Sequence, residues 1–306
     1  MEKLIVSSSP HIRGKDTTRS IMLDVLISLS PCVIAGVVLF GFNALLVVAV
    51  TTATSILTEY LSRIILKRPQ TVGDLSSAVT GVILGLILPP DCNVLVAAFG
   101  AVAAIAVVKQ MFGGIGKNIA NPACTARIIL LVSFSAMSVW RNTNFMTDAV
   151  TSATPLAAGE GVYGYLDLFL GNCGGCIGET CSLAILLGFA YLLYRRVVSP
   201  VIPLAFIGSA AIMSLICGQD VLYQVLSGGL LFGAVFMATD YATSPISLPG
   251  KIIFGCGCGV FTILIRVYGS LPEGVSYAIL LMNIIAPQLD NLFIPKAFGE
   301  ERSKKK

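Results

Sequence analysis

The chain has 306 residues, of which 56% are hydrophobic and only 12% are charged. Soluble domains carry roughly a quarter charged residues, so this composition excludes a water-soluble globular protein and indicates an integral membrane protein. The net charge of +4 gives no indication of nucleic acid binding. The sequence contains no Ser/His/Asp set, HExxH motif or nucleotide-binding βαβ unit, which excludes a hydrolase and a soluble dehydrogenase.

The predicted elements begin with a polar leader, residues 1–20, which lacks the pattern of a cleaved signal peptide. Long continuous apolar segments follow and favour helices over a β-barrel, whose strands would be short and alternating. Ten spans are predicted, at 21–41, 44–66, 75–90, 93–111, 124–140, 179–195, 199–217, 221–237, 252–268 and 274–290. A long loop, 141–178, separates the fifth span from the sixth, and a basic tail, 291–306, follows the tenth.

The basic residues predict the orientation of these spans. With the N-terminus inside, eighteen of the twenty Lys and Arg residues fall on the inner side, and only Arg141 and Arg266 fall outside. Because cytoplasmic loops of membrane proteins are enriched in Lys and Arg, this distribution places both termini in the cytoplasm. The loop 141–178 is then predicted to lie outside the cell.

The ten spans divide into two sets of five, 21–140 and 179–290, and an odd number per set predicts inverted repeats. The third and eighth spans are short and glycine-broken, and their sequences are similar from Gly81 to Asp91 and from Gly229 to Asp240. Broken spans at matching places in inverted repeats point to a pathway or site near the membrane midplane. The alternative is chance similarity, with glycines that serve only close helix packing.

Three polar segments are candidate sites. Residues 148–155 (DAVTSATP) are rich in hydroxyl groups, although an ordinary turn bent at Pro155 would explain them alone. Residues 113–122 (GGIGKNIANP) combine glycines with Asn118 and Asn121, which suits a planar heteroaromatic ring with imide edges. The segment is not a phosphate P-loop, and a tight polar loop is the alternative.

The third segment, residues 171–181 (GNCGGCIGETC), opens the sixth span, and a helix N-terminus favours anionic ligands. Gly178, Glu179 and Thr180 are therefore predicted to contact a cofactor, although Glu179 would oppose a nearby phosphate. Cys173 and Cys176 have the spacing of metal ligands, but one pair does not complete a four-ligand site, and no metal is expected.

Five charged residues lie in or at the ends of spans, where charges are costly and often functional. For each of them the alternative is a charge that reaches the interface or pairs with a neighbour. They are Asp24, Glu59, Arg127, Glu179 and Asp290.

The motifs GGIGKNIANPA, DAVTSATP, GNCGGCIGETCSLAILLG, FMATDYATSP and IRVYGSLPEGVSYAILLMNIIAP occur in this order over nearly the whole chain. Together they resemble the RnfD family of the Rnf electron-transport complex and, more distantly, the NqrB component of the sodium-pumping NADH:quinone reductase. The resemblance implies a urea-transporter-like membrane flavoprotein in a translocase that moves electrons between ferredoxin and NAD and transports Na⁺ or H⁺.

The resemblance also implies the cofactors. FMN is expected as a phosphoester on Thr154, and Ser152 belongs to the attachment motif. The family form of this motif is Ser-Gly-Ala-Thr. In this chain Ser152 is followed directly by Ala153, so the glycine is absent. A second, non-covalent riboflavin is expected at Asn118 and Asn121. Glu59 and Asp290 occupy places that match carboxylates tied to cation movement. No side chain is expected to catalyse bond making, because the flavins carry the chemistry.

The implied partners are the other Rnf subunits, RnfA, RnfB, RnfC, RnfE and RnfG, above all the FMN-carrying RnfG and the iron–sulfur subunits RnfA and RnfE. A flavin transferase would attach the FMN, the location would be a prokaryotic inner membrane, and membrane lipid would surround the chain. The rival hypothesis is a urea-transporter-like solute channel or transporter, which has the same inverted halves but no flavin.

Overall fold

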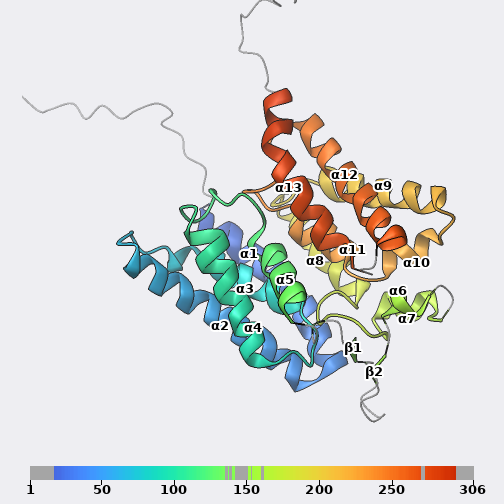
Figure 1. The fold of residues 1–306 in the computed structure, drawn as a ribbon, viewed down its shortest axis with the longest axis horizontal. Helices are drawn as coiled ribbons and strands as arrows, with labels where there is room; N and C mark the ends of the chain where they lie inside the picture. The colour runs from blue at the N-terminus through green and yellow to red at the C-terminus, as the bar shows by residue number, and fades with distance from the viewer. Residues whose placement is uncertain are drawn as a thin grey trace, which may run out of the picture.

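The computed structural model describes residues 17–134, 137, 140–141, 151–152, 154–159, 162–269 and 273–293. Nearly all of the regular structure in these residues is helical (Figure 1). The first part of the chain contains α1 (Thr18–Phe40), α2 (Phe42–Ile65), η1 (Val72–Asp74), α3 (Ser76–Leu86), α4 (Val94–Val102), η2 (Ala103–Gln110) and α5 (Pro122–Ser133). The connecting region contains β1 (Trp140–Arg141), β2 (Thr151–Ser152), α6 (Pro155–Ala158) and α7 (Tyr165–Leu170). The last part contains α8 (Ser182–Tyr194), α9 (Val201–Ile216), α10 (Val221–Leu226), α11 (Leu230–Phe232), η4 (Gly233–Met237), α12 (Leu248–Tyr268) and α13 (Val275–Leu292).

The length and apolar composition of its helices identify the chain as a membrane protein. Within the described residues, α1, α2 and α12 are each long and apolar enough to cross a membrane. Five shorter apolar helices accompany them, at Ser76–Leu86, Val94–Gln110, Pro122–Ser133, Ser182–Tyr194 and Val201–Ile216. Each of the ten predicted spans contains helix, whereas ten membrane crossings and the inverted repeats remain predictions.

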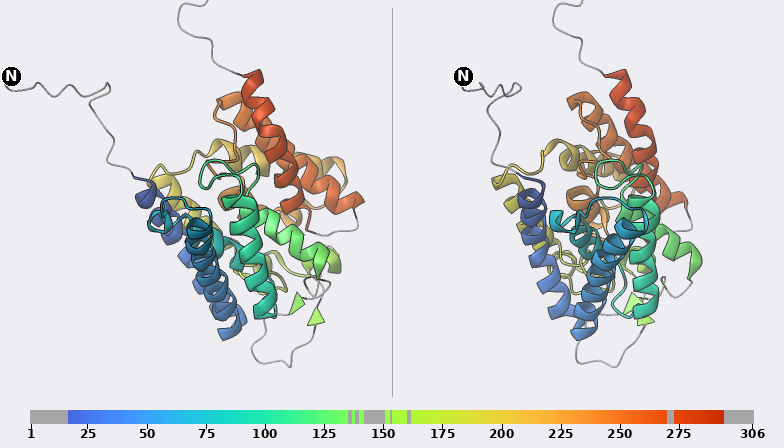
Figure 2. Two further views of the ribbon diagram at one scale, coloured as in Figure 1. Left: turned by 60° about the vertical axis from the view of Figure 1, so that its left-hand side comes forward. Right: turned by 90° about the vertical axis from the view of Figure 1, so that its left-hand side faces the viewer.

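The two parts of the chain lie side by side. Helices α1–α5 form one side and α8–α13 the other, and the start of α1 and the end of α13 lie toward the end of the molecule opposite the β1–β2 pair (Figures 1 and 2). On the first side α2 packs against α3 and α4, and on the second α12 packs against α9 and α13. Helices α1 and α8 join the sides, and Arg195 Nη2 lies 3.1 Å from Asp24 Oδ2 across their contact. Asp24 is therefore a paired charge.

Close packing of α2 against α3 depends on glycine. A Cβ atom on Gly81 would lie 2.6 Å from Thr52 Cα, and one on Gly85 would lie 2.6 Å from Thr51 Oγ1. Small residues at this spacing let two helix backbones approach closely, as in many membrane proteins. The packing role of these glycines is thus confirmed, whatever the relation between the third and eighth spans.

Both of the short spans are interrupted. The third ends as helix at Leu86, ahead of Pro89 and Pro90, and the carbonyl oxygens of Leu86 and Leu88 accept hydrogen bonds from Gly178 N (2.7 Å) and Ile177 N (3.2 Å). The eighth is divided into α10 and the continuous α11–η4 by Ser227, Gly228 and Gly229. A backbone group that leaves a helix inside a membrane protein needs another partner. The loop 171–181 supplies it for the third span.

The fifth span is shorter than predicted. Helix α5 ends at Ser133, and Phe134 has an extended backbone with φ −133° and ψ 110°. Within the rest of the predicted range 124–140, Trp140 begins β1, and Arg141 and Trp140 pair antiparallel with Thr151 and Ser152 of β2. The segment 148–155 is therefore partly a strand pair and partly the start of α6, and only its residues 151–152 and 154–155 are described.

Candidate functional site

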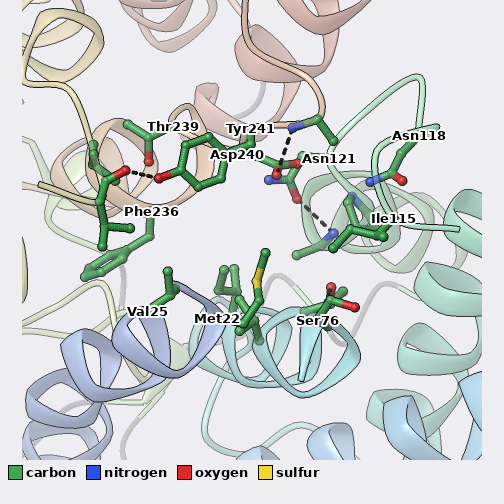
Figure 3. Close-up of a pocket in the computed structure, with 18 of the residues that line it drawn as sticks. Met22, Val25, Ser76, Ile115, Asn118, Asn121, Phe236, Thr239, Asp240 and Tyr241 are labelled. Atoms are coloured by element: carbon green, nitrogen blue, oxygen red, sulfur yellow. Dashed lines mark hydrogen bonds between the residues drawn. The ribbon is translucent and has the colours of Figure 1, made fainter. Parts of the chain in front are cut away.

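A first pocket, the asparagine pocket, lies between the two sides of the molecule (Figure 3). The space between its walls that no protein atom fills, open mouth included, is about 780 Å³. Helices α1 and α3, both π-helical segments η2 and η4, and the loops after them supply its walls. The lining includes Met22, Ser76, Lys109, Asn118, Asn121, Phe236 and Asp240.

The two predicted asparagines have different roles. Asn121 is buried, and its Oδ1 accepts hydrogen bonds from Ala123 N (3.0 Å) and Cys124 N (3.3 Å), which caps α5. Its Nδ2 donates to the carbonyl of Met237 at 3.1 Å and ties the cap to η4. Since both polar atoms of the side chain are engaged, Asn121 builds the wall of the pocket.

Asn118 is free to meet a ligand. Its side chain lines the same pocket, and among the described residues its buried Oδ1 has no hydrogen-bond partner. A buried acceptor without a partner costs about 1–3 kcal/mol, so such an atom marks a place where a ligand or water would bind. Of the two asparagines, Asn118 therefore has the stronger claim to a cofactor.

The glycines of the 113–116 turn have a structural reason. Gly113, Gly114 and Gly116 all have positive φ, at 122°, 101° and 79°, where other residues are strained. A Cβ on Gly114 would also lie 2.4 Å from a guanidinium nitrogen of Arg63. The glycines were expected to let a ligand approach the backbone closely, but at Gly114 it is the Arg63 side chain that does so.

A buried ion pair forms part of the same wall. Lys109 Nζ lies 3.2 Å from Glu59 Oε2 and donates to Ser76 Oγ at 2.7 Å. Thr71 Oγ1 and Gln110 Nε2 each donate to Glu59 Oε1 at 2.9 Å. Both charged side chains are almost fully buried, so Glu59 is a paired and fully hydrogen-bonded carboxylate. The sequence alone does not predict that Lys109 pairs with Glu59, because the pattern shows only a basic residue at the end of a span.

Asp290 belongs to a separate network. Its Oδ1 accepts hydrogen bonds from the backbone N–H groups of Ile246 (2.9 Å) and Ser247 (3.4 Å), just before α12. In this position the carboxylate holds the connection between η4 and α12 to α13. The structure therefore brings Glu59 and Asp290 into no common contact, and a cation role for either remains a prediction.

A second pocket, the Thr154 pocket, lies beside the break in the eighth span. Thr154 is 5% exposed and lines it together with the loop 173–180, Leu226, Gly228 and Glu273. The space between its walls that no protein atom fills, open mouth included, is about 370 Å³. Three segments distant in sequence thus meet at the predicted attachment residue. Ser152 lies in the paired strand β2, and its side chain is outside the described residues.

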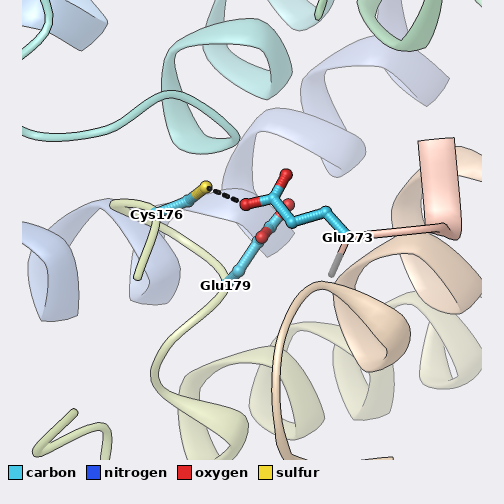
Figure 4. A group of neighbouring side chains, drawn as sticks. All are labelled: Cys176, Glu179 and Glu273. Carbon is cyan, nitrogen blue, oxygen red and sulfur yellow. Dashed lines mark hydrogen bonds between the residues drawn. The ribbon is translucent and has the colours of Figure 1, made fainter. Parts of the chain in front are cut away.

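Arg127 is the centre of the charges at this pocket. Its Nη1 and Nη2 lie 3.2 and 3.1 Å from Cys176 Sγ, and its Nη1 lies 3.8 Å from Glu179 Oε1. Its Nη2 also donates to Glu273 Oε2, and Cys176 Sγ lies 3.9 Å from Glu273 Oε1 (Figure 4). The guanidinium of α5 therefore joins two loops of the second part of the chain. The sequence pattern alone explains Glu273 only as part of a helix start.

The same group has the ligand types of a metal site. One ligand atom each of Cys176, Glu179 and Glu273 lies within 4.8 Å of the others (Figure 4). Arg127 contacts all three and places a positive charge at the centre of the cluster. This arrangement accounts for the cluster as an ion-pair network.

Several polar atoms around the Thr154 pocket lack a partner in the described part of the chain. They are Thr180 Oγ1, Ser227 Oγ and Arg266 Nε, all buried. The other nitrogens of Arg266 donate to Gln224 O (2.7 Å) and Ser227 O (3.2 Å), and so satisfy carbonyls at the end of α10. Unpartnered hydroxyl and guanidinium groups are suitable donors for an anionic oxygen. Gly178, in contrast, serves packing: a Cβ there would lie 2.7 Å from Leu86 Cβ.

Comparison with known proteins gives the family. A family model described as the NQR2, RnfD, RnfE family matches residues 5–299. The chain is 45% identical to the D subunit of the Na⁺-translocating ferredoxin:NAD⁺ oxidoreductase complex of Acetobacterium woodii, over 99% of this chain and 97% of the relative. It is 38% identical to the D subunit of the proton-translocating ferredoxin:NAD⁺ oxidoreductase complex of Clostridium ljungdahlii, over 97% and 96%. It is 35% identical to the D subunit of the ion-translocating oxidoreductase complex of Stutzerimonas stutzeri, over 91% of each. The chain therefore belongs to the NQR2, RnfD, RnfE family.

Proposed function

We propose that the chain is the RnfD-type membrane subunit of an ion-translocating ferredoxin:NAD⁺ oxidoreductase complex, and that Thr154 carries FMN through a phosphoester. The relatives named for this complex match the chain over nearly its full length and support the first part. The second part rests on the buried place of Thr154 in a pocket that also holds the Thr180 hydroxyl, which has no partner in the described part of the chain. The partners would be the other subunits of the complex, with a flavin transferase for attachment.

The residues of the Thr154 pocket fit a phosphoester. Thr180 offers a hydroxyl donor within the pocket. Arg266 reaches the lining residue Gly228, where a Cβ would lie 3.0 Å from its Nη2, and its buried Nε has no partner among the described residues. Arg127 donates a hydrogen bond to Glu273 and lies 3.8 Å from Glu179, so its positive charge offsets part of the repulsion between these carboxyl groups and an anion. A bound FMN would supply one- and two-electron transfer. The chain's own part would be to anchor the phosphate and exclude water from its surroundings.

The asparagine pocket suits a second, non-covalent flavin such as riboflavin. Its aliphatic walls would cover a planar ring, and Asn118 and Asp240 would offer an amide and a carboxylate to the imide edge of the ring. Lys109 would lie at the wall as a positive charge. These groups bind and orient; none of them makes or breaks a covalent bond.

In-gel flavin fluorescence tests the attachment. The chain is co-expressed with a flavin transferase and its partner subunits, denatured and separated on a gel, and Thr154→Ala is compared with Thr151→Ala, which makes the same hydroxyl-to-alanine change nearby. Fluorescence in the wild type and in Thr151→Ala, and none in Thr154→Ala, is the expected result. Fluorescence that persists in Thr154→Ala would refute the attachment residue.

The same gel separates the proposal from its rival. A urea-transporter-like channel or transporter would carry no flavin, so a wild-type band without fluorescence under transferase co-expression would favour that hypothesis. Ferredoxin-driven NAD⁺ reduction in membrane vesicles, measured with and without Na⁺, would then identify the transported ion.

A further inference from the structure

Two carboxyl groups, the buried Glu179 and the partly buried Glu273, share one guanidinium beside the Thr154 pocket. Glu179 is 8% exposed and precedes α8, whereas Glu273 precedes α13. One carboxylate oxygen of each residue lies within 4.8 Å of the other and of Cys176 Sγ. Arg127 forms a direct hydrogen bond with Glu273 but lies 3.8 Å from Glu179. The positive charge of Arg127 is therefore used mainly by Glu273.

The other groups around Glu179 do not replace that charge. Its carboxyl group faces Cys176, Glu273, Arg127 and Arg266, and it packs against Gly229, where a Cβ would lie 2.6 Å from its carboxyl carbon. Arg266 donates its hydrogen bonds to carbonyl oxygens at the end of α10, and its remaining nitrogen has no partner among the described residues. Two carboxylates thus have one directly bonded cation. A buried carboxylate without a full ion pair is costly, and the usual outcome is protonation.

A second observation points to a ligand at this place. Thr180 is 5% exposed, lines the same pocket and has a hydroxyl without a partner in the described residues. Its hydroxyl can accept a hydrogen bond as well as donate one, so it can accept from a protonated carboxyl group or donate to an anionic oxygen. The pocket therefore contains a carboxyl group that protonation would stabilise, Glu179, and a hydroxyl group able to form a hydrogen bond, that of Thr180.

We propose that Glu179 is a proton-binding site, whose carboxyl group takes up and releases one proton while Arg127 stays hydrogen-bonded to Glu273. Binding converts the carboxylate of Glu179 into a carboxylic acid and adds one positive charge to the cluster, and release to water reverses both changes. Glu273, whose side chain is 16% exposed, offers the edge through which the proton exchanges with solvent. An anionic phosphoester at Thr154 would raise the affinity of Glu179 for this proton, and this effect alone depends on the proposed function.

Infrared difference spectroscopy of the assembled complex tests the site. Spectra are taken as the pH is raised from mildly acidic to mildly basic, and the C=O stretch of a buried carboxylic acid is followed. In the wild type this band is expected to decrease as the pH rises. Glu179→Gln should remove it, and Glu273→Gln should make it disappear at a lower pH, because Arg127 is then free to pair with Glu179. Asp220→Asn, which removes a carboxyl group outside the cluster and leaves an N-cap side chain before α10, should leave the band unchanged.

Two results would overturn the proton-binding site at Glu179. A wild-type complex without a pH-dependent carboxylic acid band overturns it, and so does a band that survives in Glu179→Gln. Thr154→Ala addresses the proposed function separately: a negative group at Thr154 predicts that its removal moves the band's loss to lower pH. An unchanged band in Thr154→Ala argues against the phosphoester and leaves the proton site supported.

Discussion

Glu59 of α2 and Lys109 of η2 form a buried ion pair, with 3.2 Å between Oε2 and Nζ, at the wall of the asparagine pocket. Their side chains are only 1% and 3% exposed. Lys109 lies at the end of a π-helical segment, a backbone form that is frequent at functional sites. The pair therefore joins Lys109, which lines the pocket, to α2, so the position of this wall depends on how α2 packs against η2.

Replacing Lys109 by methionine should destabilise the protein. The change leaves the carboxylate of Glu59 buried with hydrogen bonds but no cation, which costs roughly 3–5 kcal/mol when one partner of a buried pair is removed. Thermal unfolding of the solubilised complex measures the effect, with Lys117→Met as the control because Lys117 is exposed. Equal melting temperatures for the two variants would contradict the structural role of the pair.

Arg127 should not tolerate lysine. Lysine keeps the charge but lacks the planar fork that contacts Cys176, Glu179 and Glu273 together. Arg127→Lys is expected to lower the melting temperature and the fluorescence of covalently bound flavin, and Arg127→Met to lower both further. The control is Arg196→Lys, on an exposed arginine. A loss in Arg127→Lys no larger than in Arg196→Lys would show that the network has no such role.

Much of the helical structure follows from the sequence because a long apolar run is a local signal. Helices occur at 18–40, 42–65 and 248–268, close to their predicted spans. The breaks were less predictable. Helix α3 stops at Leu86 because the chain turns at Pro89 and Pro90 and its free carbonyls bond to the loop at 177–178, which is far away in sequence. A pattern along one segment carries no signal of such a partner.

The site was predictable as segments but not as contacts. Residues of the asparagine and Thr154 segments line pockets, and flavin binding at either stays a prediction. The division of labour between Asn118 and Asn121 depends on whether a side chain caps the next helix, and both asparagines have suitable spacing on paper. Lys109, Glu273 and Arg266 were missed because their importance comes from partners that lie 50, 146 and 42 residues away in the chain.

The two asparagines can be separated by experiment. Asn118→Ala should lower non-covalent flavin content with little change in stability, because its Oδ1 has no partner among the described residues. Asn121→Asp should keep the cap on α5 but place a buried carboxylate oxygen against the Met237 carbonyl oxygen, at a cost of at least about 1–3 kcal/mol. Flavin released by denaturant and thermal unfolding are measured on the same samples. An Asn118→Ala protein that retains the wild-type flavin content would exclude Asn118 as a ligand.

The glycine contact between α2 and α3 gives a prediction that needs no cofactor. At Gly81 an added methyl group would meet Thr52 Cα at 2.6 Å and the Thr51 carbonyl oxygen at 2.9 Å, so the helices must move apart. Gly81→Ala should therefore destabilise the protein by roughly 1–3 kcal/mol, the usual cost of overpacking. Gly208 of α9 is the matched control, since a Cβ there has no atom within 4 Å.

Gly208→Ala is expected to be neutral or to stabilise α9 by up to about 1 kcal/mol, because alanine has the higher helix propensity. Thermal unfolding of both variants in the same detergent gives the comparison. Helix α3 also lines the asparagine pocket through Ser76 and Ile83, so Gly81→Ala should lower non-covalent flavin content as well. If the two variants melt together, the α2–α3 contact is looser in the membrane than its backbone distances imply, and the glycines need another explanation.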